Sequence, residues 1–153
     1  MATILITGAS RGIGQEMARR AAARGDSVIA ALRDPAAADL PEGVERHALD
    51  ATDPADHARL AEALGARAID ILVCNAGIYR GRGRFGAEPL PAEGFGAEDW
   101  AATLMTNVAG PFFAVQAFLP HLRRAEAGRI AIISSQMGST TRAPGGSYIY
   151  RAS

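Results

Sequence analysis

The sequence predicts an α/β fold, a doubly wound parallel sheet of about five strands with helices on both faces. Short apolar runs that contain β-branched residues alternate along the chain with longer segments of helical periodicity. Strands and helices that alternate at this spacing form right-handed βαβ units, which build a parallel sheet. A glycine or a polar residue follows each expected strand. Because ligands of such sheets bind at the carboxyl ends of the strands, a binding site is expected at that edge.

The first strand and the turn after it lie within residues 2–14. The run 3–7 is apolar and β-branched, as suits a short buried strand. Gly8, Gly12 and Gly14 follow, and glycines let a backbone approach a ligand closely. The N-terminus of the next helix would direct unpaired N–H groups and its positive dipole end at the turn, which favours a phosphate. A glycine turn after a strand often has only a structural role, so the rest of the chain must show whether this one binds a phosphate.

Strands and helices then alternate through the first half of the chain. The helix after the turn carries an apolar stripe that includes Ile13, and it ends at Gly25. Apolar runs predict three further strands and one helix, at 27–32, 44–49, 69–74 and 54–64. The helix is expected to bury its apolar face, at Ala58, Leu60, Ala61 and Leu64. Arg33, Asp50 and Asn75 stand just after the three strands.

Residues 78–97 interrupt this rhythm. They contain five glycines, two prolines and the alternating Arg80, Arg82 and Arg84, so we expect an irregular surface loop. Arginines in such a loop are more typical of a solvated surface than of a nucleic-acid site. The formal net charge of zero gives no other sign of such a site, and no nucleic-acid partner is expected.

A long helix is predicted at 98–124. Glu98 and Asp99 open it, where the helix dipole favours acidic residues, and Pro111 is expected to bend it or to cost it a hydrogen bond. Its apolar side chains are expected to face the core, at Trp100, Leu104, Val108, Phe112, Val115, Phe118 and Leu122. Since this is more apolar surface than one sheet face needs, we predict a homo-oligomer through this helix. A fifth strand is expected at 129–134.

Length and composition indicate a single globular domain over residues 1–153. Hydrophobic residues make up 48% and charged residues 21% of the chain, enough for a sizeable core. Cys74 is the only cysteine, so no intrachain disulfide can form and a cytoplasmic location is expected. Neither a signal peptide nor a membrane span is expected. His47, His57 and His121 lack metal-ligand spacing, so we expect structural or surface histidines and no metal site.

Five motifs, found after the strands and in the long helix, belong together. Residues 7–14 read TGASRGIG and residues 74–77 read CNAG. Asn107 lies in the long helix, Ser135 in SSQMG and Tyr150 in YRAS. In this combination they resemble the short-chain dehydrogenase/reductase family, with its TGxxxGxG turn and an NNAG segment whose first asparagine is a cysteine. The resemblance, closest in flavour to carbonyl-reductase and C-factor-like members, implies a Rossmann fold and an oxidoreductase with a small carbonyl or alcohol substrate.

The resemblance also implies which residues bind the cofactor, namely Gly8, Ser10, Arg11, Gly12, Ile13, Gly14, Arg33, Asp50, Asn75, Ala76 and Gly77. Asp50 would accept a hydrogen bond from the adenine amino group. Enzymes that take NAD(H) usually place an acidic residue at the end of the second strand. Here Arg33 follows that strand and Arg11 lies in the turn, and two guanidiniums suit a 2′-phosphate. Asp34 is the counter-signal, so NADP(H) is preferred and NAD(H) is the alternative.

Three residues would carry the chemistry that the resemblance implies. Tyr150 would be the general acid that protonates the developing alkoxide, and Ser135 would hydrogen-bond the carbonyl oxygen. Asn107 would be the family's structural and catalytic asparagine. Plainer interpretations are a turn hydroxyl for Ser135 and a polar interruption of a helix for Asn107. Tyr148 is a rival of Tyr150, although the register of the family's tyrosine motif fits Tyr150.

One catalytic residue of the family has no counterpart. Its lysine would fall one residue past Ser153, and this chain contains no lysine. In the family that lysine binds the nicotinamide ribose and lowers the pKa of the tyrosine. We therefore expect the N-terminal portion of a longer enzyme, impaired in catalysis as it stands. The alternative is a truncated, non-catalytic nucleotide-binding or interaction protein with the same fold.

Overall fold

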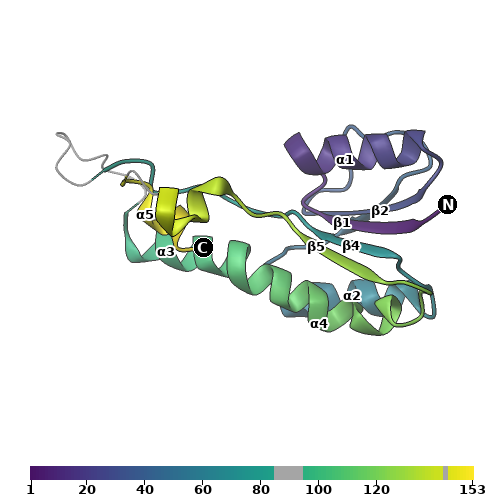
Figure 1. The fold of residues 1–153 in the computed structure, drawn as a ribbon. Coiled ribbons are helices and arrows are strands. Elements are labelled where there is room, and N and C mark those ends of the chain that lie inside the picture. The colour runs from purple at the N-terminus through teal and green to yellow at the C-terminus, as the bar shows by residue number, and fades with distance from the viewer. Residues whose placement is uncertain (85–94, 143–144) are drawn as a thin grey trace. The chain divides into compact units, whose positions relative to one another are not determined.

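The computed structural model describes residues 1–84, 95–142 and 145–153 (Figure 1). These residues form two compact units. Unit 1 comprises Met1–Ala76 and Gly110–Ile133, and unit 2 comprises Gly77–Ala109 and Ser134–Ser153. Half of the expected loop 78–97, residues 85–94, lies outside the described part of the chain.

Unit 1 is built on a five-stranded sheet in which every pair of neighbours is parallel, as the sequence predicts. The strands are Thr3–Thr7 (β1), Ser27–Leu32 (β2), Glu45–Ala48 (β3), Ile71–Cys74 (β4) and Arg129–Ile132 (β5). They lie in the order β3-β2-β1-β4-β5, because the chain adds β2 and β3 on one side of β1 and then crosses over to add β4 and β5. The carboxyl ends of β1 and β4 therefore meet where the winding reverses, which is where such sheets bind ligands.

Helices cover both faces of the sheet (Figure 1). α1 (Gly12–Ala23) packs on β1 and β2, and its Ala18 belongs to the core on that face. α2 (Pro54–Leu64) and α4 (Gly110–Leu122) cover the opposite face, where Phe118 belongs to a second core. Because successive side chains of a strand point to opposite faces, the central strands supply both cores.

Two of the expected core positions in these helices are wrong. Ile13 is 65% exposed, because it lies in the first turn of α1 where the glycine turn opens to solvent. Ala58 is exposed as well. The buried stripe of α2 runs instead through His57, Leu60 and Leu64, at the three- and four-residue spacing of one helix face.

Unit 2 contains α3 (Ala97–Leu104), the π-helix η1 (Met105–Ala109), the 3-10 turns η2 (Gln136–Gly138) and η3 (Thr140–Arg142), and α5 (Tyr148–Arg151). The helix predicted at 98–124 is thus a run from Ala97 to Leu122 with a π-turn inside it. Pro111 has no N–H to bond to the carbonyl oxygen of Asn107, which favours the break in the α-helical pattern. By length and composition alone the run could cross a membrane, a test that core helices of soluble proteins also pass.

The apolar positions predicted to face the core are only partly buried. Phe118 and Leu122 are buried in unit 1, as predicted, whereas Phe112 is 65% exposed. Three more of the predicted positions are exposed in unit 2, at Trp100, Leu104 and Val108. From Trp100 to Phe112 the row advances in steps of four residues, each of which turns a helix by about 400°, so it drifts by about 40° per step and Phe112 leaves the face that Phe118 occupies.

Candidate functional site

Three glycines shape the turn between β1 and α1. Gly8 has a φ of +71°, and a Cβ on it would lie 2.7 Å from the Cα of Ala76. Gly12 has a φ of +59°, and nothing lies within 4 Å of the place where its Cβ would be. A Cβ on Gly14 would collide with the side chain of Asn75 and the carbonyl of Gly8. Gly8 and Gly14 therefore allow close packing, while Gly12 leaves open space at the start of the helix.

The N-terminus of α1 fits an anionic group. Arg11 is the N-cap residue, yet no side chain caps the helix with a hydrogen bond, and the first turn holds no acidic residue. Ser10, Arg11, Gly12 and Ile13 are all exposed. The first N–H groups of the helix and its positive dipole end thus face open space, as a bound pyrophosphate would require.

Asn75 and Thr7 join the end of β4 to the glycine turn. The Asn75 Nδ2 donates to the carbonyl oxygens of Thr7 and Gly8, at 3.0 and 3.1 Å. In return the Thr7 Oγ1 accepts from the backbone N–H groups of Asn75 and Ala76, at 3.1 and 3.2 Å. Thr7 is not among the predicted site residues, although its place at the head of the TGxxxGxG motif was the signal that could have identified it.

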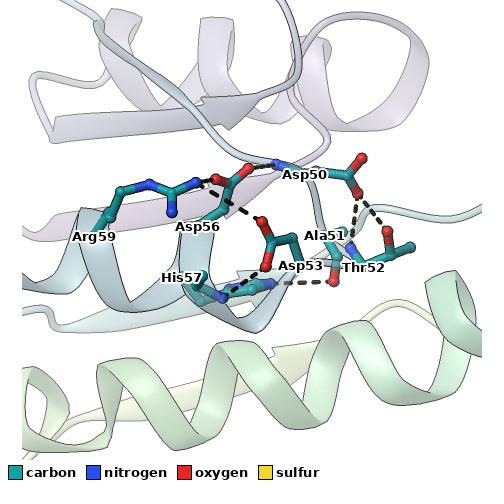
Figure 2. A network of polar contacts seen from close by, with 8 residues as sticks. Asp50, Ala51, Thr52, Asp53, Asp56, His57 and Arg59 are labelled. Atoms are coloured by element: carbon teal, nitrogen blue, oxygen red, sulfur yellow. Dashed lines mark hydrogen bonds and ion pairs between the residues drawn. The ribbon is translucent and has the colours of Figure 1, made fainter.

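Asp50 lies beyond the end of β3 and is held by a network of polar contacts (Figure 2). Its Oδ1 accepts from the backbone N–H and the hydroxyl of Thr52, both at 2.8 Å. These bonds, together with the nearby charge of Arg33, hold the pKa of Asp50 below its usual value. Its other carboxylate oxygen accepts no hydrogen bond from a described residue. Asp50 is therefore an ionised carboxylate with one oxygen available to a ligand.

The two arginines predicted to hold a 2′-phosphate are both in unit 1. Arg11 and Arg33 are exposed, and neither side chain is hydrogen-bonded to any other residue that the structure describes. Asp34, the counter-signal, uses its Oδ1 to accept from the backbone N–H groups of Ala36 and Ala37, at 3.1 and 3.3 Å. That carboxylate is engaged in its own turn, while both guanidiniums are available to an anion.

Cys74 ends β4 directly before Asn75. It is buried, and burial raises the pKa of its thiol to about 11. A thiol with that pKa stays protonated at neutral pH, so Cys74 is a small core residue and not a nucleophile.

Asn107 lies in the π-turn η1 of unit 2 and holds two other segments. Its Oδ1 accepts from the backbone N–H of Ile78 at 2.9 Å, and its Nδ2 donates to the carbonyl oxygen of Ile78 at 3.0 Å. The same Nδ2 donates to the Ser153 Oγ at 2.8 Å. Both amide hydrogens are therefore used. Asn107 ties the segment after β4 to the segment after α5, and π-turns are frequent at functional sites.

Ser135 and α5 are linked through one backbone residue. The Ser135 Oγ accepts from the backbone N–H of Met137 at 3.2 Å. The Arg151 Nη1 donates to the carbonyl oxygen of Met137 and its Nε to that of Gly146, each at 2.8 Å. One guanidinium therefore fastens α5, which carries Tyr150, to the turn that carries Ser135.

Tyr150 stacks on a second tyrosine. The ring of Tyr79 lies 4.4 Å from the ring of Tyr150, centroid to centroid, and its hydroxyl is 2.6 Å from the Ser147 Oγ. Ser147 has a φ of +51° and directly precedes α5. The guanidinium of Arg82 lies 4.6 Å from the centroid of the Tyr79 ring. The segment after β4 therefore touches the helix that carries the predicted acid.

The predicted site residues thus fall into two groups. The cofactor-binding candidates from Gly8 to Ala76 all belong to unit 1. Gly77 and the three catalytic candidates, Asn107, Ser135 and Tyr150, belong to unit 2. Within unit 2, Asn107 and the Ser135 turn are each bonded to a residue of the short segment that follows Ser147.

Comparison with known proteins identifies the family of the chain. Residues 2–153 match the family described as short chain dehydrogenase. The short-chain dehydrogenase RED3 of Pyricularia oryzae is 33% identical over 150 residues, which cover 90% of this chain and 58% of that protein. The NADP-dependent 3-hydroxy acid dehydrogenase YdfG of Salmonella typhi is 35% identical over 156 residues, which cover 95% of this chain and 58% of that protein.

Solved structures give the same result. A short-chain dehydrogenase/reductase from Burkholderia multivorans with bound NADP superposes with a TM-score of 0.84 and 30% identity, covering 99% of this chain and 66% of that one. A short chain dehydrogenase from Escherichia coli in complex with NADPH superposes with a TM-score of 0.83 and 26% identity, covering 99% of this chain and 65% of that one. The chain spans about half the length of the curated relatives it matches. By sequence and by fold, it belongs to the short-chain dehydrogenase family.

Proposed function

We propose that the protein is an NADP(H)-dependent oxidoreductase acting on the carbonyl or alcohol group of a small molecule. The observation that carries the proposal is the glycine turn of unit 1. Its uncapped helix N-terminus and the open space at Gly12 suit the pyrophosphate of a dinucleotide. The nicotinamide cofactor would supply or accept the hydride.

The preference for NADP(H) is supported by charge. Arg11 and Arg33 are exposed and available, whereas Asp34 is engaged by backbone N–H groups of its own turn. Guanidiniums bind a phosphate with paired hydrogen bonds, which a ribose hydroxyl cannot match. Two similar solved proteins, from Burkholderia multivorans and Escherichia coli, hold NADP and NADPH.

The chemical step would belong to unit 2. Tyr150 would donate a proton to the oxygen of the reacting carbonyl, and Ser135 would hydrogen-bond that oxygen. Asn107 would act as a positioning residue, because both of its amide hydrogens are committed to Ile78 and Ser153.

The carrying observation is tested by placing a charge at Gly12. Asparagine and aspartate both tolerate the left-handed backbone of this residue, and open space surrounds it. We expect Gly12→Asp to weaken NADP+ binding about tenfold or more relative to Gly12→Asn, because a carboxylate there repels the pyrophosphate. Isothermal titration calorimetry on the chain gives both affinities.

Two results would overturn the proposal. The first is a parent chain that binds no dinucleotide, and the second is an aspartate variant that binds as well as the asparagine one. If the dinucleotide binds, but a chain extended past Ser153 turns over no aldehyde or ketone, the non-catalytic nucleotide-binding alternative replaces the enzyme.

A further inference from the structure

His57 is buried beside the turn that carries Asp50 (Figure 2). It lies on the inner face of α2, with 1% of its surface exposed. Its Nε2 is 3.1 Å from the carbonyl oxygen of Ala51. The edges of Phe113 and Phe118, from α4, lie against the ring, with centroids at 6.3 and 6.2 Å. One side of the imidazole therefore meets a backbone carbonyl, and the other meets aromatic rings.

The contacts fix the protonation state of this ring. A carbonyl oxygen only accepts hydrogen bonds, so Nε2 carries the proton and donates it to Ala51. Nδ1 is buried and has no partner among the residues that the structure describes. A second proton on Nδ1 would place a charge in an apolar site with no acceptor. Burial accordingly lowers the pKa of His57 below its usual value, and the ring is neutral.

The turn after β3 is held at three consecutive residues. The backbone N–H of Asp50 donates to the Asp56 Oδ2 at 2.7 Å. The Asp50 Oδ1 is bonded to the N–H and the hydroxyl of Thr52. The carbonyl of Ala51, between them, is bonded to His57. Only the bond to His57 anchors the turn to the buried face of α2, and the other three bonds lie among partly exposed groups.

We propose that His57 is a positioning residue for the adenine end of the dinucleotide. Its Nε2–H holds the Ala51 carbonyl, and the turn so fixed presents the uncommitted oxygen of Asp50 to the exocyclic amino group of adenine. This inference rests on the proposed function, because it requires that the chain bind a dinucleotide.

Acid should release this anchor. The charged groups that face His57 are Asp50 and Asp53, on the side of the turn. α4 presents Phe113 and Phe118, and the Phe118 ring also contacts His121. Two carboxylates near the water-facing side do not supply an acceptor for Nδ1, so the protonated ring must leave its pocket. As pH falls below about 6.5, the unfolded state binds this proton before the folded state does, and stability falls with it.

The test compares two dinucleotides that differ at one group of the base. NAD+ carries the amino group of adenine, whereas nicotinamide hypoxanthine dinucleotide carries a carbonyl oxygen there and cannot donate to Asp50. Neither has a 2′-phosphate that would titrate in the range studied. For the parent chain at pH 7.5 we expect NAD+ to bind about tenfold more tightly or better, as for a hydrogen bond to a charged group.

Three variants separate positioning from packing. His57→Leu keeps the site apolar but removes the N–H. The ratio of the affinities for NAD+ and for the hypoxanthine dinucleotide should therefore fall from about ten towards one, while the affinity for the hypoxanthine dinucleotide stays unchanged. His57→Gln keeps an N–H donor that does not titrate, so the preference should persist, and the loss of adenine binding between pH 7 and pH 5 should disappear. His47→Gln, on β3 and outside the network, should keep both the preference and the pH dependence of the parent.

Each contrary result has its own meaning. A parent that binds neither dinucleotide overturns the proposed function. A parent that binds both equally, or a folded His57→Leu chain that keeps the full adenine preference, overturns the role of His57 alone. If His57→Leu does not fold by circular dichroism, the glutamine variant decides, because an unchanged pH dependence in that variant also overturns the role.

Discussion

At the scale of single residues, Arg11 and Arg33 are expected to choose between the two nicotinamide dinucleotides. Both guanidiniums are exposed and have no hydrogen-bond partner among the described side chains and backbone groups. We predict that Arg33→Ala weakens NADP+ binding about tenfold or more, because bonds to the 2′-phosphate are lost, and leaves NAD+ binding unchanged. Arg11→Ala should act in the same direction. Calorimetric titration with each dinucleotide checks this.

Arg124→Ala is the matched control for that prediction. Arg124 is also exposed, but it follows α4, whose last turn lies at the amino end of β4, since the N–H of Ile69 donates to the carbonyl of His121 there. Removing this arginine changes the net charge equally at the opposite edge of the sheet. Equal affinities of the parent for NADP+ and NAD+ would contradict the prediction.

The roles of Tyr150 and Tyr148 can be distinguished by removing the hydroxyl group of each in turn. In a chain extended past Ser153 we predict that Tyr150→Phe lowers kcat for carbonyl reduction about 10²–10⁴-fold, because the general acid is gone. Tyr148→Phe should stay within a few-fold of the parent. NADPH oxidation followed at 340 nm with a panel of aldehydes and ketones measures both, and the opposite ranking would make Tyr148 the acid.

At the scale of elements, α5 is a single turn of helix that depends on side chains for its position. Arg151 donates to the carbonyls of Met137 and Gly146, and five planar donors allow it to serve both at once. We predict that Arg151→Ala speeds hydrogen exchange of the α5 amides about tenfold or more, since two bonds from a charged donor are lost. Arg151→Lys should restore only part of the protection. Exchange measured by mass spectrometry tests this.

Arg142→Ala provides the comparison for α5. Arg142 is exposed in η3 of the same unit and bonds to neither carbonyl. If it speeds exchange in α5 as much as Arg151→Ala does, the two bonds of Arg151 do not hold the helix.

The sequence predicts the elements well where local pattern and burial agree. Strand 27–32 and helix 54–64 match β2 and α2 at both ends, because an apolar run and a Pro-started, Gly-ended helix carry their own boundaries. The helix at 98–124 is predicted less well, since no periodicity in the sequence reveals the π-turn η1. Its apolar row also drifts around the axis, so Phe112 faces solvent while Phe118 faces the core.

The candidate site divides in the same way. The glycine turn was predictable, because the close packing at Gly8 and Gly14 leaves no room for a Cβ, and this requirement appears in the sequence as a glycine motif. The contacts of Arg151 and His57 were not, because they depend on which carbonyl a side chain meets after the chain has folded. Whether Ser135 and Tyr150 act together on a substrate stays a prediction.

At the scale of the whole molecule, exposed apolar side chains predict self-association. Phe112, on α4, and Ile132, on the edge strand β5, are both exposed. We predict a homo-oligomer that Phe112→Glu weakens, because a charge cannot be buried in an apolar contact. Ala58→Glu, which adds the same charge at an exposed position of α2, should leave association unchanged. Light scattering at high protein concentration measures both, and a monomeric parent would contradict the prediction.

The location of the protein in the cytoplasm and the absence of a nucleic-acid partner stay predictions as well. Both come from composition, and neither depends on a feature of the fold. The helical run Ala97–Leu122 is the segment on which a membrane experiment would focus, since its length and apolar character would permit a span.

The bonds between Asn75 and Thr7 also set an order of events during synthesis. They join residues 68 positions apart, so the chain must close that loop before the glycine turn gains its support. A nascent chain that has released only β1, α1 and β2 carries all three glycines and the bond from the Gly8 N–H to the carbonyl oxygen of Ala31, but it still lacks the contacts of Asn75. The glycine turn therefore gains its full support late, when β4 leaves the ribosome and inserts beside β1, and we expect that a dinucleotide bound there as proposed cannot assist the folding of anything made before it.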